Sequence, residues 1–183
     1  ARTLSLLQRG LTQIRSTVAA LLVEAKVEDR PFAPHDIDDL RILVEAEAHT
    51  HAVGLFVDGN IAAPLPLPAT LIRQIVLNLL LNAVSAAGEG GMVRLHARDT
   101  GEVLTLAVHN DGRHIPPEEM AYLFEPFVST TQRGHGLGLW IVYQIVQQLN
   151  GSIAVDSEPG ATTFTIEIPY DGPAGAAPAP VPD

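Results

Sequence analysis

The order of helical and extended segments after residue 30 most limits what this chain can fold into. Apolar residues recur with helical spacing over residues 36–51, 70–87 and 136–149, and a shorter helix is expected over 118–124. Strand patterns cover residues 53–57, 92–98, 103–109, 153–156 and 162–168. Strands that follow each other directly are expected to pair as antiparallel hairpins, so three helices must cover one face of the sheet. The order predicts an α+β fold, a two-layer α/β sandwich, and not a doubly wound nucleotide-binding fold.

Turn-forming residues set the expected ends of these segments. The expected boundaries are an N-cap near His35-Asp36, a turn at Asp58-Gly59-Asn60, a loop or edge segment over residues 61–68, a helix end at Gly88, and a C-cap at Gly151.

One long helix is expected before this domain, over residues 2–28. Its apolar residues recur at alternating spacings of three and four, at Leu4, Leu7, Leu11, Ile14, Val18, Leu21 and Ala25. Such a heptad seam is typical of a helix that packs against other helices. Two interpretations stay open, a helix lying on its own domain and a dimerising bundle. The narrow seam favours the bundle, because the apolar face of a globular helix is usually wider.

Composition excludes several classes of protein. Hydrophobic residues make up 46% of the 183 residues, which is enough for a core and unlike a disordered chain. The net charge of −10 disfavours nucleic-acid binding, and the lack of cysteine excludes disulfides and thiolate chemistry. The first residues lack the features of a signal peptide. We therefore expect a cytoplasmic location, with a tether of the parent protein to the inner membrane left open.

Two asparagines on the most apolar helix are the first candidate site. Asn78 and Asn82 are four residues apart, so they lie on one helical face among leucines and valines. Buried amides without partners would each cost about 1–3 kcal/mol. They either cap neighbouring backbone or line a polar cavity, where an amide oxygen suits a Mg²⁺ ion that keeps water and phosphate ligands.

Two glycine-containing segments follow. Asn110-Asp111-Gly112 places an acceptor side chain at the end of a strand, although alone it is an ordinary turn. Gly134-His135-Gly136-Leu137-Gly138 opens a helix, where backbone N–H groups and the helix N-terminus favour phosphate. The second segment matches neither a P-loop nor the dinucleotide-binding fingerprint.

The combination of motifs is more specific than any one of them. Asn-x-x-x-Asn-Ala, Asn-Asp-Gly-x-x-Ile-Pro, Leu-Phe-Glu-Pro-Phe and Gly-x-Gly-Leu-Gly-Leu occur in this order between residues 78 and 139. They resemble the N, G1, F and G2 boxes of the ATP-binding catalytic domain of two-component sensor histidine kinases, in the GHKL superfamily. The resemblance implies a Bergerat ATP-binding fold over residues 31–170. Residues 1–30 then resemble the second helix of a dimerisation hairpin. Residues 171–183 are rich in Pro, Ala and Gly, so a disordered tail is expected there.

The resemblance also implies roles for single residues. Asn82 would be the Mg²⁺ ligand with Asn78 assisting, Asn110 would stand where the family reads adenine with an aspartate, and Gly112 would let the base approach. Residues 128–136 would form a lid hinged by Phe124 and Phe127, and Gly136 and Gly138 would present N–H groups to the phosphates. The remaining implied nucleotide contacts are Ile115, Arg133, Gly134, His135, Leu137 and Thr162.

Departures from the family pattern limit the expected activity. Asn110 replaces a charged acceptor by a neutral one, which predicts weaker ATP binding. His114 replaces the second glycine of the same motif. Thr131 stands where many relatives carry a lysine, and Arg133 could supply the missing positive charge. None of the seven histidines lies in the family's phosphoacceptor pattern, so this chain is not expected to phosphorylate itself.

The sequence therefore predicts the kinase domain of a sensor histidine kinase, using ATP and Mg²⁺. Its γ-phosphoryl acceptor would be a histidine on a helix absent from this chain, with onward transfer to a response regulator and a homodimer through residues 2–28. The alternatives are a catalytically weakened nucleotide-binding regulatory module and a pure coiled-coil scaffold that binds no ATP. Asn78 argues against the ATP-hydrolysing relatives, because an amide cannot take a proton as their glutamate does.

Overall fold

The computed structural model describes residues 30–126 and 137–171. The helix expected over residues 2–28 and nearly all of the tail expected over 171–183 lie outside these ranges. The elements are β1 Pro31–Phe32, α2 Pro34–Thr50, β2 Gly54–Gly59, β3 Leu65–Pro68, α3 Ala69–Ala87, β4 Met92–Asp99, β5 Val103–Asn110, α4 Pro117–Met120, α5 Gly138–Gln148, β6 Ser152–Glu158 and β7 Ala161–Pro169.

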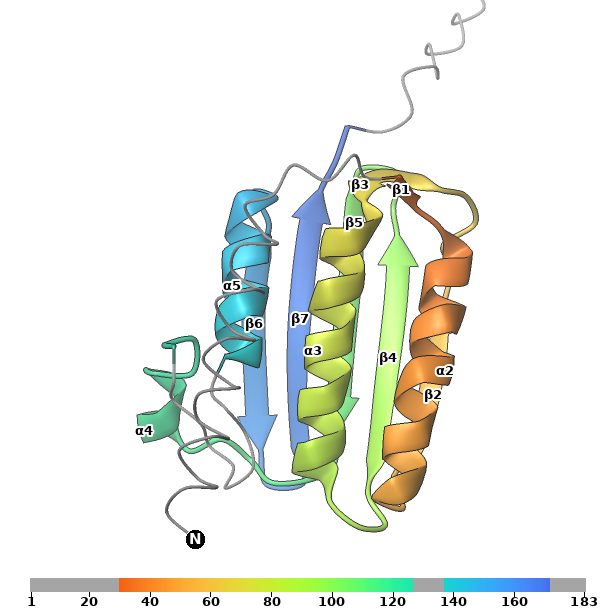
Figure 1. Cartoon of the computed structure of the whole chain (residues 1–183). Helices are drawn as coiled ribbons and strands as arrows, with labels where there is room; N and C mark the ends of the chain where they lie inside the picture. The colour runs from red at the N-terminus through yellow and green to blue at the C-terminus, as the bar shows by residue number, and fades with distance from the viewer. Residues whose placement is uncertain (1–29, 127–136, 172–183) are drawn as a thin grey trace, which may run out of the picture.

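The domain has two layers, as the sequence predicts. Its main sheet has the strand order β2-β4-β5-β7-β6, and α2, α3 and α5 lie together on one face of it (Figure 1). The hairpins β4–β5 and β6–β7 are antiparallel, which confirms the expected pairing. Strand β2 runs parallel to β4, a pairing reached through α3 that no local pattern indicates. The segment expected as a loop or edge contains β3, which pairs with β1 in a small second sheet.

Helix α3 forms the centre of the core. Eight of its residues are buried: Ala69, Ile72, Ile75, Val76, Leu79, Leu80, Ala83 and Val84. It contacts α2, α5 and strand β5. Judged by length and composition alone, α3 is also the one helix in the described part of the chain that could cross a membrane. Its place against the sheet explains this composition, because a helix covered on several sides is apolar around much of its circumference.

The start of α2 differs from the expectation. The helix begins at Pro34 with Ala33 as the N-cap, so the predicted N-cap at His35-Asp36 is wrong. Asp36 lies instead at the third helical position, where its Oδ2 accepts the backbone N–H of Ala33 at 2.9 Å. The carboxylate satisfies a free backbone donor of the helix end from inside the first turn.

Two glycines have other roles than those expected. Gly59 belongs to strand β2 and not to a turn, and a Cβ on it would lie 2.4 Å from the carbonyl oxygen of Ala97. At the end of α5 the left-handed residue is Asn150, with φ of 54°, and not Gly151. The N–H of Gly151 donates to the carbonyl of Val146 at 2.9 Å, which is the six-to-one bond of a Schellman motif.

Asp36 is a buried charge held by two arginines. Its side chain is fully buried, and Arg30 and Arg73 donate to it at 2.5 and 2.8 Å. Burial alone would raise the pKa of Asp36, but the hydrogen bonds from Arg30, the Ala33 N–H and Arg73 outweigh it and hold that pKa well below its ordinary value. The ion pairs therefore join helix α2, which carries Asp36, to the residue before β1 and to helix α3.

Replacing Asp36 by asparagine is expected to lower the free energy of unfolding at pH 7 by about 2–3 kcal/mol. A carboxyl whose folded pKa is depressed stabilises the fold above its unfolded pKa of about 4 and loses that contribution as the pH falls further. The wild-type chain should therefore lose more stability than the variant between about pH 5 and pH 2. Denaturant unfolding at a series of pH values measures both effects.

Asp39→Asn is the matched control. Asp39 also pairs with Arg73, but its side chain is 54% exposed, so the loss should stay below about 1 kcal/mol. Parallel stability curves for Asp36→Asn and the wild-type chain across this pH range would contradict the role given to Asp36.

Candidate functional site

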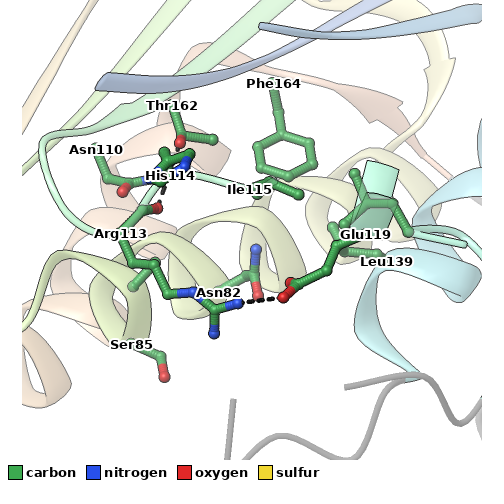
Figure 2. A pocket seen from close by; sticks show the side chains of 12 residues that line it. Asn82, Ser85, Asn110, Arg113, His114, Ile115, Glu119, Leu139, Thr162 and Phe164 are labelled. Atoms are coloured by element: carbon green, nitrogen blue, oxygen red, sulfur yellow. Dashed lines mark hydrogen bonds and ion pairs between the residues drawn. The ribbon is translucent and has the colours of Figure 1, made fainter. Parts of the chain in front are cut away.

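A cavity of about 90 Å³ opens at the end of the sheet where β5 and β7 meet the last turns of α3 and the first turn of α5. Four residues predicted from the sequence line it: Asn82, Asn110, Ile115 and Thr162. Figure 2 shows these side chains together with Ser85, Arg113, His114, Glu119, Leu139 and Phe164, which also line it. The structure thus brings the N-box and G1-box asparagines, far apart in sequence, to one cavity.

Asn110 and Thr162 form the inner wall of this cavity. They are direct neighbours on the paired strands β5 and β7, and only 1% and 2% of their surfaces are exposed. Asn110 Oδ1 accepts the backbone N–H of Gly112 at 3.2 Å. Polar side chains this deeply buried have to be hydrogen-bonded or to face a ligand or water.

Ser157 on β6 was not identified from the sequence, although it holds the cavity wall together. Its Oγ accepts the backbone N–H of Ile115 at 2.8 Å and lies 2.6 Å from Thr162 Oγ1. Thr162 Oγ1 in turn donates to the carbonyl of Arg113 at 3.5 Å. These bonds tie the loop after β5 to the β6–β7 hairpin. The one signal in the sequence is alternation, because Ser157 continues an inward-facing row begun by Ile153 and Val155.

Gly112 has a structural reason to be glycine. A Cβ on it would lie 1.9 Å from the carbonyl oxygen of Ala86, at the end of α3. The next residue, Arg113, donates its N–H to the same carbonyl at 3.2 Å. Gly112 does not line the cavity, so its close approach to α3 positions the loop that does.

The two asparagines of α3 lie differently. Asn82 lines the cavity, whereas Asn78 faces the start of α5, where a Cβ on Gly138 would lie 3.3 Å from Asn78 Oδ1. Asn78 Nδ2 donates to the carbonyl of Gln74 at 2.9 Å. Leu137 is buried in the core, so only its backbone can serve a ligand. The sequence favoured a single polar cavity lined by both amides. In the structure Asn82 lines the cavity, and Asn78 lies against the first residue of α5.

The other predicted site residues, Phe127, Arg133, Gly134, His135 and Gly136, lie outside the described residues. The hinge expected at Phe124 is described, and its ring stacks on Tyr143 of α5 with a centroid distance of 5.6 Å. The short helix expected over residues 118–124 is α4, Pro117–Met120, so it ends before Phe124.

An ion pair that the sequence did not indicate lines the same cavity as Asn82. Arg113 Nη2 and Glu119 Oε1 are 2.5 Å apart, and Figure 2 shows this contact at the cavity. Glu119 Oε2 is buried and has no hydrogen-bond partner among the described residues. The pair joins the loop after β5 to α4, at 51% and 32% side-chain exposure, where such pairs add little stability.

The few protein oxygens at the cavity suit a metal ion that takes most of its coordination from a bound phosphate ligand and water. No group of three or more His, Cys, Asp or Glu side chains in the described ranges could hold a metal ion. The cavity offers two hard oxygen donors, the amide oxygen of Asn82 and the carboxylate oxygen Oε2 of Glu119. This matches Mg²⁺, which usually takes one or two protein oxygens and completes its shell with water and phosphate.

Comparison with known proteins agrees with this geometry. Residues 68–172 match the family model described as "Histidine kinase-, DNA gyrase B-, and HSP90-like ATPase". The chain is 32% identical over 162 residues to the sensor histidine kinase RcsC of Escherichia coli, covering 81% of this chain and 17% of RcsC. It therefore spans about a sixth of the length of that relative.

Solved structures give the same result. The catalytic domain of histidine kinase ThkA aligns with a TM-score of 0.71 at 28% identity, over 78% of this chain and 96% of that one. Full-length ShkA in complex with AMPPNP aligns with a TM-score of 0.76 at 25% identity, over 91% of this chain and 37% of that one. The chain belongs to the histidine kinase-, DNA gyrase B- and HSP90-like ATPase family and carries the ATP-binding domain of a sensor histidine kinase.

Proposed function

We propose that this domain transfers the γ-phosphoryl group of Mg-ATP to a histidine carried on a helix outside this chain. The observation that carries the proposal is the placement of Asn82 and of the Asn110–Thr162 pair around one cavity, with Leu139 of the glycine-entered helix α5 at its rim. A nucleotide bound there would have a buried polar wall for its base and a helix N-terminus for its phosphates.

The base would lie against Asn110 and Thr162. Both are nearly fully buried, so a base that contacts them is shielded from water. The apolar side chains of Ile115, Leu139 and Phe164 at the same cavity supply the flat contact that a purine ring needs.

The phosphates would extend toward α3 and α5. Asn82 would hold the magnesium ion through its amide oxygen, and the ion would neutralise phosphate charge. Gly138 is the first residue of α5 and has no side chain to keep a phosphate group away from its backbone. The N–H groups of the first turn of α5 would therefore face the phosphate oxygens.

Asn78 fits transfer to an imidazole better than hydrolysis. A neutral imidazole nitrogen attacks the γ-phosphorus with its own lone pair while the bond to the β-phosphate oxygen breaks and ADP leaves. No general base has to take a proton from the nucleophile first, and Asn78 cannot act as one. The protein then contributes mainly positioning and charge neutralisation.

The partners follow from this role. We place the acceptor histidine on a dimerisation helix of the same kinase family, the homodimer contact on residues 2–28, and the next phosphoryl acceptor on a response regulator. The reaction needs cytoplasmic ATP, so we assign the domain to the cytoplasm whether or not its parent protein is tethered to a membrane.

Calorimetry with ATP, with and without Mg²⁺, tests nucleotide binding by the 183-residue chain. We expect saturable binding that is tighter with Mg²⁺. Labelled ATP mixed with this chain and a separate acceptor-helix fragment tests transfer, and we expect label on the fragment only. Binding without label on any matched acceptor helix would favour the regulatory module, and no binding at all would refute both.

A further inference from the structure

We propose that the uncovered face of the main sheet packs against the same face of a second copy of this chain. The three helices that cover the sheet, α2, α3 and α5, all lie on its other face (Figure 1). Antiparallel strands commonly leave one face to water, so a bare face alone does not indicate a partner. The arrangement of charges on this face does, and it involves none of the residues that line the nucleotide cavity.

The strand register fixes which side chains share this face. Residues opposite each other on neighbouring strands point to the same side of a sheet. Arg94 on β4 lies opposite His109 on β5. His109 lies opposite Thr163 on β7, which in turn lies opposite Asp156 on β6. Arg94 is exposed and both its neighbours in β4 are buried, so this row lies on the uncovered face, with a positive charge at one end and a negative charge at the other.

A second row repeats this pattern of charge. Four residues further along β4, Arg98 lies opposite Thr105 on β5, and Thr105 lies opposite Glu167 on β7. Arg98 and Glu167 are both exposed. His96, between the two arginines of β4, already contacts Asp58 of β2. The uncovered face is thus positive along β4 and negative along β7 and β6.

The charges at the ends of these rows are unpaired within the described part of the chain. Arg94 and Arg98, unlike the other arginines in residues 30–126 and 137–171, form no ion pair with another residue in those ranges. The same holds there for Asp156 and Glu167. Strands in a sheet lie about 4.8 Å apart, and β5 and β7 separate β4 from β6, so Arg94 and Asp156 are about 14 Å apart. That distance is too long for an ion pair within one copy.

A two-fold axis that runs along the strands, between β5 and β7, would bring opposite charges together. It lays one sheet face to face on the other, keeps each row at its height and exchanges the two sides of the face. Arg94 of one copy then faces Asp156 of the other, and Arg98 faces the side that carries Glu167, with each contact formed twice. An axis across the strands would instead place Arg94 against Arg98 of the second copy. The charges therefore favour the axis along the strands.

The middle of the face suits close packing. Ala107 and Thr165 lie opposite each other between the two charged rows, and such small side chains let two sheets approach to the usual spacing of about 10 Å. Four facing strands about 25 Å long give a contact of roughly 500 Å² on each copy, which is close to the least that a specific interface needs. We therefore expect a weak association that depends on the charged pairs.

The chain has no cysteine, so one introduced cysteine can report this contact. In the two-fold arrangement the two copies of residue 107 lie about 10 Å apart on facing sheets. A bis-maleimide linker of that length should therefore join two chains of Ala107→Cys. Adding Arg94→Glu or Asp156→Arg should each reduce the cross-linked yield about tenfold or more, because like charges then face each other twice.

Mixing the two charge variants distinguishes lost pairing from lost folding. In a mixed pair every substituted position again faces the opposite charge, so an equal mixture should recover most of the yield of Ala107→Cys alone. A variant that had merely unfolded could not recover in this way. Arg41→Glu makes the same change of charge on α2, which lies on the other face of the sheet, and should leave the yield unchanged.

The outcomes decide the inference without touching the proposed function. No cross-linked dimer of Ala107→Cys would overturn it and leave this face to water. A yield that Arg94→Glu does not lower would show chance collision and would also overturn it. A mixture that stays as low as either variant alone would overturn the pairing of Arg94 with Asp156, on which the two-fold arrangement depends.

Discussion

Replacing Asn82 by alanine is expected to lower the rate of phosphoryl transfer by about 10²–10³-fold, the usual cost of removing one preorganised polar group from a reacting centre. Asn82 is the amide of α3 that lines the cavity, and the described residues hold no cluster of carboxylates and histidines to replace it. The affinity for ATP without Mg²⁺ should change little, whereas the gain in affinity on adding Mg²⁺ should largely disappear. Calorimetry with and without Mg²⁺ and transfer of label to an acceptor-helix fragment measure the two effects.

Ser85→Ala is the control for Asn82→Ala. Ser85 lines the same cavity from the same helix, and its side chain is exposed to solvent. It should retain both Mg²⁺ dependence and transfer. If Asn82→Ala keeps the full magnesium effect, the metal must be held elsewhere and the assignment of Asn82 fails.

The alternation of buried and exposed residues explains why the layers were predictable. Strand β5 alternates without interruption from Val103 to Asn110, and α3 carries apolar residues at helical spacing. Local patterns of this kind report which side of an element is buried. They do not report partners, so the parallel pairing of β2 with β4 was not predicted.

The site was predictable only where its chemistry lies in a motif. Asn82, Asn110 and Thr162 were found because they belong to segments with a recognisable order. Ser157 was missed because its partners, such as Ile115, lie on other segments of the chain. The Arg113–Glu119 ion pair was missed because the two residues are six apart, which matches neither a helical nor a strand spacing. Contacts of this kind depend on the tertiary fold.

Gly112→Ala is expected to destabilise the domain by about 3 kcal/mol. Gly112 has no positive φ, so its conformation alone would accept alanine. The cost comes from space, since the new Cβ would lie 1.9 Å from the Ala86 carbonyl oxygen and 2.5 Å from the Ala87 Cα. These are backbone atoms of α3 that cannot rotate away. Denaturant unfolding measures the loss.

The same substitution should abolish nucleotide binding in the molecules that stay folded. Moving the loop off α3 breaks the bond from the Arg113 N–H to Ala86 and shifts Ile115 away from Ser157, so the wall formed by Asn110 and Thr162 is lost. Gly54→Ala is the matched control, because its nearest neighbour is the end of the Phe56 ring at 3.3 Å, which can give way. A Gly112→Ala chain that binds ATP as the wild type does would show that the cavity does not depend on this close approach.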